Sequence, residues 1–213
     1  MTNEIMSVHK ALAELKILGD KVEKSINTGI FCTENMNYSK VIGGMTIEDY
    51  KNKVIKASYD KTEDLLKRYV AIKNSVNESN AKTEIEVGNT KMTIAVAIWM
   101  KNQGMLYKEQ YLEKLKNQFS SSQRRIETNN AGRMQRADDY VIKKYGMKEG
   151  KVSDVDVTKE KENYINDNTM TLIDPCNIAM KITMLESEID SFNAEIDAAI
   201  SCSNALTQIE ISY

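Results

Sequence analysis

Basic side chains cluster in the second half of the chain, and they are the residues best suited to binding chemistry. Between 124 and 151, eight Arg and Lys residues outnumber four Asp and Glu residues. The basic residues are Arg124, Arg125, Arg133, Arg136, Lys143, Lys144, Lys148 and Lys151. Such a cluster on a helix can contact phosphate groups or the acidic surface of a partner protein.

Asp138 and Asp139 lie inside this basic region, and no DNA-reading motif accompanies it. A locally neutralised surface or a subunit interface is therefore the favoured interpretation. Tyr140 and Tyr145 flank the basic helix. Tyrosines are common at interfaces, so we expect these two to make aromatic contacts there.

Residues for metal or nucleophilic catalysis are missing from the sequence. His9 is the only His, so neither a zinc site nor a His-dependent triad has the residues it needs. Cys32, Cys176 and Cys202 form no Cys-x-x-Cys motif, and we expect them to be small buried side chains. The sequence predicts a protein that is not an enzyme, with no catalytic residue, metal or cofactor.

Acidic residues recur along the last predicted helix at polar positions. They are Glu186, Glu188, Asp190, Glu195 and Asp197. Inward-facing Glu-x-x-His repeats, which would indicate a di-iron bundle, are absent. We therefore expect a solvated helix face.

The overall composition gives no case for a nucleic-acid or membrane partner. Across 213 residues, 29 Lys and Arg balance 31 Asp and Glu. The N-terminus lacks the apolar core of a signal peptide, and no apolar run reaches the 18 or more residues of a membrane span. The expected location is a virion or the cytoplasm of a bacterial host.

Apolar periodicity predicts long helices over 5–26, 47–80, 94–126 and 175–206. The predicted N-caps are Thr46, Thr93 and Asp174, with Pro175 at the first helical position of the last helix. Gly29 is expected to close the first helix in a left-handed conformation.

Alternating apolar residues predict short strands at 83–87, 90–93 and 207–212. A turn at Gly88-Asn89 should join the first two strands into a hairpin.

An internal repeat links the middle of the chain to its end. Segment 79–87 (SNAKTEIEV) returns as 203–211 (SNALTQIEI) with six of nine positions identical. We interpret the copies as two helix-then-strand units whose strands share one sheet.

The predicted fold is therefore mainly α (α+β). Long antiparallel helices form a bundle with a small three-stranded sheet (83–87, 90–93, 207–212). Residues 1–213 are expected to form a single helical domain, from which an irregular arm or loop projects at 129–173. Within that segment, "RMQRADDYVIKKYG" (133–146) predicts a shorter helix that stops at Gly146.

The segments "SNAKTEIEV…TKMTIAVAI" and "DPCNIAMKI…SNALTQIEI" resemble an uncharacterised family of bacterial and phage-associated helical proteins, some labelled septicolysin-like and others from integron cassettes. The resemblance covers about 60–128 and 174–211. Many relatives carry an Arg-Asp pair after the "MTIAxAI" helix start, where this chain has Met100-Lys101. The resemblance implies a mobile-element origin and a self-associating helical fold, and it brings no catalytic motif.

The leading functional expectation is a non-enzymatic phage or prophage structural or accessory protein. It would form a homo-oligomer through its amphipathic helices and contact other virion or host proteins. One alternative is a module that binds a small ligand or a protein, as a counter-defence factor does. A further alternative is a nucleic-acid-associated factor that uses the 124–151 basic surface, although nucleic acid is not an expected partner.

Overall fold

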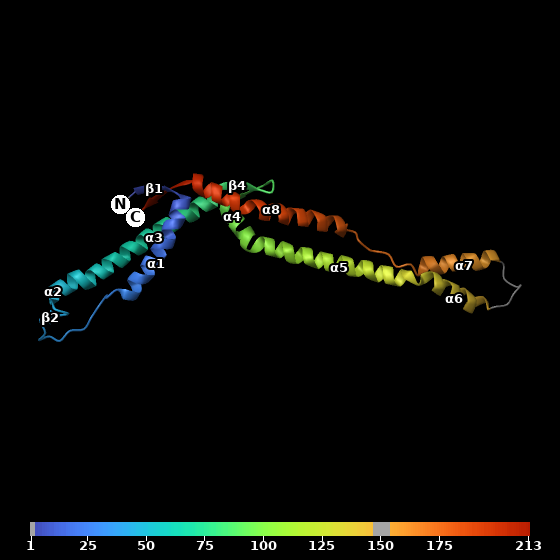
Figure 1. The fold of residues 1–213 in the computed structure, drawn as a ribbon, viewed down its shortest axis with the longest axis horizontal. Coiled ribbons are helices and arrows are strands. Elements are labelled where there is room, and N and C mark those ends of the chain that lie inside the picture. Colours follow the sequence, from blue (N-terminus) through green and yellow to red (C-terminus); the bar gives the residue numbers. More distant parts are fainter. Residues whose placement is uncertain (1–2, 147–153) are drawn as a thin grey trace. The chain divides into compact units, whose positions relative to one another are not determined.

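The computed structural model describes residues 3–146 and 154–213 (Figure 1). The chain is mainly helical with small two-stranded sheets, which confirms the mainly α (α+β) prediction. It divides into two compact units. The first unit comprises Met1–Gln103 and Ser191–Tyr213, and the second comprises Gly104–Asp190.

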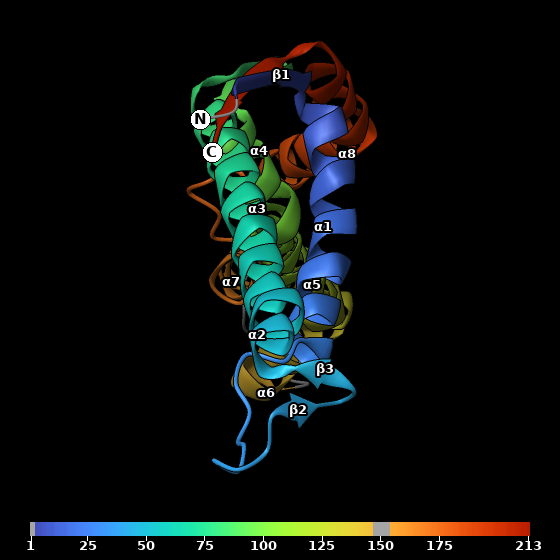
Figure 2. The same ribbon diagram turned by 90° about the vertical axis from the view of Figure 1, so that its left-hand side faces the viewer.

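In the first unit, two long helices pack side by side (Figure 2). They are α1 (Val8–Thr28) and α3 (Ala57–Lys82), and α3 follows without a break from α2 (Ile47–Tyr50) and the π-helical η1 (Lys51–Lys56). Their facing sides form an apolar core together with both ends of the chain. Its buried members are Met6, Val8, Ala11, Leu15, Leu18, Ile72, Val76, Ile209 and Ile211.

The two ends of the chain pair with each other. Strand β1 (Asn3–Ser7) runs antiparallel to β6 (Gln208–Ser212), with Glu4 opposite Ile211. The labelled termini consequently lie together in Figure 1. The strand β4 (Glu84–Val87) pairs with β5 (Thr90–Thr93), and β2 (Val41–Ile42) pairs with β3 (Met45–Thr46).

The predicted three-stranded sheet is therefore wrong, although the three strands assigned to it exist. The strand at 208–212 pairs with residues 3–7, of which 5–7 were predicted to begin the first helix. Ile5 and Val8 lie three residues apart and fit a helical stripe, but Ile5 is 70% exposed while the adjacent Met6 is 3% exposed. That alternation is the signature of a strand with one buried face.

A unit made of a strand pair, a capped helix start and a helix occurs three times. In each, one strand ends in Met-Ser or Met-Thr, at Met6, Met45 and Met92, and the Val or Ile that follows begins the helix. In each copy the hydroxyl accepts a hydrogen bond from the backbone N–H three residues later. The donors are Lys10 to Ser7 at 3.3 Å, Asp49 to Thr46 at 3.1 Å, and Val96 to Thr93 at 3.3 Å. The predicted caps at Thr46 and Thr93 are confirmed.

Two of these copies match in detail, and one of them is split between the ends of the chain. In one copy α3 passes into the β4–β5 hairpin and then into α4 (Ile94–Trp99). In the other, α8 (Ile178–Leu206) passes into β6, which pairs with β1, and β1 leads into α1. The same backbone bonds close both copies: Thr83 N–H to Ser79 and Thr207 N–H to Ser203, at 2.8 and 2.9 Å.

The second unit is built from helices. It contains α5 (Met105–Ala131), which continues from the π-helical η2 (Met100–Gly104), then α6 (Arg133–Tyr145), α7 (Asp154–Asp167) and the first part of α8. The shorter helix predicted at 133–146 is confirmed as α6, whereas the prediction of irregular structure in the rest of 129–173 is wrong over α7. Stacking of Tyr140 on Tyr164, with ring centroids 4.7 Å apart, joins these two helices. A largely polar helix such as α7 has a weak apolar stripe, so its stability comes from packing of this kind.

Two helix boundaries differ from the prediction. Gly29 ends α1 with φ −70°, an extended conformation, and a Cβ there would lie 2.5 Å from the Phe31 ring. Glycine is therefore needed for close packing and not for a left-handed turn. The last helix begins at Ile178, three residues after Pro175, although the Asp174 carboxylate does accept the Ile178 N–H at 2.7 Å.

The carboxylates of α8 lie at exposed or half-buried positions, which confirms the predicted solvated face. Several of them also form ion pairs with lysines: Glu186 with Lys116, Glu188 with Lys108, and Asp197 with Lys101. The cysteines differ from the prediction. Cys32, Cys176 and Cys202 are free and exposed, which contradicts the prediction of buried thiols.

Candidate functional site

The arginines of the basic region meet where α5 ends and α6 begins, within the second unit. Arg124 and Arg125 lie near the end of α5, and Arg136 lies in the first turn of α6. These three side chains line a cavity of about 560 Å³. Its remaining lining residues are Thr128, Asn129 and Met170.

The position of Arg136 depends on the glycine at the helix junction. Its Nη2 donates to the Asn129 carbonyl at 2.5 Å, near the C-terminal end of α5 where carbonyls lack helical partners. A Cβ on Gly132 would lie 2.9 Å from Arg136 Nη1. Gly132 therefore leaves the space that this guanidinium occupies.

The chain segment before α8 forms one side of the cavity. Asn130 donates to the Met170 carbonyl at 2.9 Å, and the Met170 N–H donates back to the Asn130 side chain at 3.0 Å. Arg133 donates to the Thr169 hydroxyl at 3.0 Å. The segment at 169–170 is thus held against the junction by bonds to neutral groups.

The lysine end of the predicted surface has a structural role. Lys144 on α6 bonds to Glu160 on α7, and Tyr140 OH donates to the same carboxylate at 3.1 Å. Lys144, and to a lesser degree Tyr140, hold the pKa of Glu160 below its usual range, and the pairing raises the pKa of Lys144. Tyr145 contributes a ring 5.6 Å from Lys144 Nζ.

The predicted set therefore separates into two groups. Arg124, Arg125 and Arg136 share the cavity, with Arg133 beside it, whereas Lys144 and Tyr140 connect α6 to α7. Lys143 is exposed on α6 and lines none of the cavities found in the described residues. Lys148 and Lys151 lie outside the described residues.

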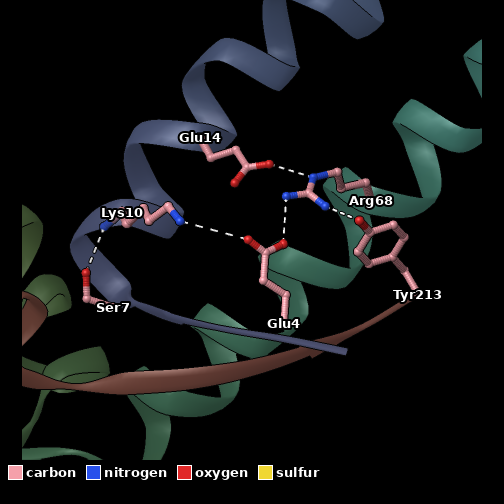
Figure 3. Close-up of polar contacts among 6 residues, drawn as sticks. All are labelled: Glu4, Ser7, Lys10, Glu14, Arg68 and Tyr213. Carbon is pink, nitrogen blue, oxygen red and sulfur yellow. Dashed lines mark hydrogen bonds and ion pairs between the residues drawn. The ribbon is translucent and has the colours of Figure 1, made fainter. Parts of the chain in front are cut away.

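A fifth arginine forms a separate cluster in the first unit (Figure 3). Arg68 on α3 donates to Glu14 of α1 at 2.5 Å and to Glu4 of β1 at 3.0 Å. It also bonds to the Tyr213 hydroxyl, and its guanidinium carbon lies 4.9 Å from the Tyr213 ring centroid. The bond to Glu14 contributes most to raising the pKa of Arg68, against the opposing effect of partial burial. Arg68 therefore fastens both chain ends to the helix pair.

Arg68, Gly132 and Met170 were not predicted as site residues, although the usage of arginine in the sequence offered a signal. The chain has 24 Lys and only five Arg, and four of the five lie between 124 and 136. The planar guanidinium of Arg can donate two hydrogen bonds to two oxygens of one carboxylate or phosphate. The restriction of Arg to position 68 and to 124–136 therefore marks these two places as candidate sites for such groups.

Two apolar surfaces of the first unit are relevant to binding. One is the segment 30–45, which leads into and includes the β2–β3 hairpin. Its exposed members are Ile30, Phe31, Met36, Tyr38, Val41 and Met45. The other is a groove of about 330 Å³ between α1 and α3, to which Gly19, Val22, Ile26, Leu66 and Tyr69 contribute.

Within residues 3–146 and 154–213, no group of three or more His, Cys, Asp or Glu could hold a metal ion. No helix of that described part is long and apolar enough to cross a membrane. Comparisons with protein-family models, curated proteins and solved structures found no match to this chain. The family resemblance therefore stays a prediction.

Proposed function

We propose that this chain is a non-enzymatic structural or accessory protein that self-assembles through its long helices. The observation that carries the proposal is the groove between α1 and α3. Two helices that pack side by side cover only one face of each other. The side of α1 and α3 that stays uncovered is apolar at the groove.

Residue spacing on α1 supports a second copy of the chain as the occupant of this groove. Leu12, Gly19 and Ile26 follow one another at seven-residue intervals, the repeat of helices that pack along a common seam. Leu12 and Ile26 are 40% and 49% exposed. A Cβ on Gly19 would meet only the Tyr69 ring, at 3.9 Å, so the seam has a recess at its centre. A large apolar side chain of a facing helix fits such a recess.

Light scattering after size exclusion tests the proposal at micromolar concentration. The wild-type chain should elute as a dimer or larger assembly, and Ile26→Glu should shift it to the monomer. Ala13→Glu is the matched control, because it adds the same charge at an exposed position of α1 outside the groove. A monomeric wild-type protein refutes self-assembly, and equal effects of the two substitutions refute the groove as its site.

The proposed setting is a phage or prophage, as the resemblance of 60–128 and 174–211 suggests. Mass spectrometry of purified virions tests this setting. Detection of the chain there, with capsid, portal or tail genes beside its own, would support it. Early lytic or defence genes in those positions would favour the binding module instead.

The exposed 30–45 segment favours that second candidate, a module that binds another protein. In the two matched strand pairs, the strand residues Val87 and Ile211 are 1% and 0% exposed. In the third pair, Val41 and Met45 are 54% and 42% exposed. Replacing Phe31 and Tyr38 by Ser leaves the groove intact, so loss of partner binding with retained self-assembly would distinguish the two functions.

A further inference from the structure

We infer that the cavity at the α5–α6 junction binds a compact phosphate group. This inference goes beyond self-assembly, since it concerns the second unit and needs no second copy of the chain. The ligand class includes inorganic phosphate or pyrophosphate and a terminal phosphate monoester of a small molecule.

The charge inside the cavity is unbalanced. Arg124, Arg125 and Arg136 contribute three positive charges, and no carboxylate is among the described lining residues. Four lysines in the described part of the same unit are paired with carboxylates, namely Lys108, Lys116, Lys144 and Lys161. The positive charges at the junction are close together and lack this compensation, so an anion that enters the cavity relieves their repulsion.

Residue type also indicates an oxyanion. A guanidinium has five N–H donors in a planar fork, which matches two oxygens of a phosphate. Arg136 uses one bond to hold itself against the Asn129 carbonyl and keeps other donors free. Thr128 and Asn129 add neutral groups that can bond to the remaining oxygens.

The cavity has fixed walls on two sides. Gly132 admits the Arg136 guanidinium to its place, and the two hydrogen bonds between Asn130 and Met170 hold the opposite wall. A site whose donors are already in place loses less entropy when a ligand binds.

The lining favours a compact ligand over a strand of nucleic acid. Proteins that bind single strands stack bases on aromatic side chains along a basic groove. The described lining of this cavity contains Met170 but no aromatic residue. All three arginines line the same cavity, with no aromatic residue in its described lining on which a base could stack.

Titration calorimetry with sodium pyrophosphate, in a phosphate-free buffer, tests the inference on the full-length chain. We expect one pyrophosphate per chain, and at least tenfold weaker binding by the Arg124→Gln/Arg125→Gln variant, since each charge-assisted bond contributes about a factor of ten or more. The matched control, Lys114→Gln/Lys143→Gln, removes two exposed charges from the same helices outside the cavity and should change affinity less than twofold.

A second variant tests the position of the Arg136 side chain without changing the charge of the cavity. Gly132→Ala keeps every arginine but brings a methyl group to 2.9 Å from Arg136 Nη1, so it should weaken pyrophosphate binding several-fold. Circular dichroism confirms that each variant retains its helix content.

Three outcomes would overturn the inference. They are no pyrophosphate binding at millimolar concentration, equal losses in the cavity and control variants, and tighter arginine-dependent binding of a twelve-residue oligothymidylate than of pyrophosphate. The last outcome would assign the site to nucleic acid. None of these results bears on the oligomeric state, so the inference and the self-assembly proposal fail independently.

Discussion

Substituting two isoleucines in the terminal strand pair tests whether the joined chain ends stabilise the first unit. Ile211 in β6 is 0% exposed and belongs to the core, whereas Ile5 in β1 is 70% exposed on the other face. Truncating a buried Ile to Ala costs about 2–5 kcal/mol, and a site with no exposed surface lies above the low end of that range. We expect a loss of about 3–4 kcal/mol for Ile211→Ala and about 0.5 kcal/mol for Ile5→Ala.

Urea unfolding followed by tryptophan fluorescence measures this difference. Trp99, the only Trp, lies in α4 and therefore reports on the first unit. With a denaturant slope of about 1–3 kcal/mol per molar, Ile211→Ala should lower the urea midpoint by about 1–4 M. If Ile211→Ala costs less than about 1 kcal/mol, or no more than Ile5→Ala, the terminal strands are a frayed edge and the reasoning is wrong.

Three other predictions concern the polar contacts and the chain ends. Arg68→Gln should lower the free energy of unfolding by about 1–3 kcal/mol, because it removes the cation paired with the partly buried Glu14 and the nearer of the two cations paired with Glu4; urea unfolding measures this. The pKa of Glu160 is lowered in the folded chain by Lys144, so this contact stabilises above the usual Glu pKa of about 4.5 and is lost as the pH falls below it. Thermal unfolding from pH 6 to 3 should show this loss, and Glu160→Gln should reduce it. A circular permutant that joins the two chain ends through Gly-Asn and opens between Gly43 and Gly44 should fold with unchanged helix content by circular dichroism, and an unfolded permutant would refute the close approach of the ends.

Features specified by neighbouring residues could be predicted from the sequence. The Gly88-Asn89 turn has φ of 56° and 62°, as expected for a two-residue hairpin turn. The Thr46 and Thr93 caps depend only on the backbone three residues later. The helix stop at Gly146, with φ 67°, likewise requires a residue tolerant of positive φ.

Features that depend on distant residues could not be predicted. Arg68 binds groups that are 54, 64 and 145 positions away along the chain, so no local pattern indicates the cluster. Strand β1 is five residues long, too short for its alternation to be distinguished from a helical stripe. Its partner is at the other end of the chain.

Only part of the candidate site could be predicted, because the rest depends on contacts between helices. Counting charges over 124–151 identified a basic region but could not separate its members. The folded chain pairs Lys144 with Glu160 of α7 and leaves the arginines at the junction without a carboxylate. The separation depends on the α6–α7 packing, and α7 was itself missed because its apolar stripe is weak.

The threefold strand–cap–helix unit explains why the chain ends belong to the core. In the β4–β5 copy, a two-residue turn joins the strands, and Ala97 of the following helix is completely buried. In the split copy the turn is replaced by the two chain ends, yet Ala11 occupies the corresponding position and is equally buried. The packing of the two copies therefore depends on the strand pair and not on the covalent turn. Because β1 has no turn to hold it, side-chain contacts such as those of Arg68 must fix it in place, and that requirement accounts for the cluster at the terminal strands.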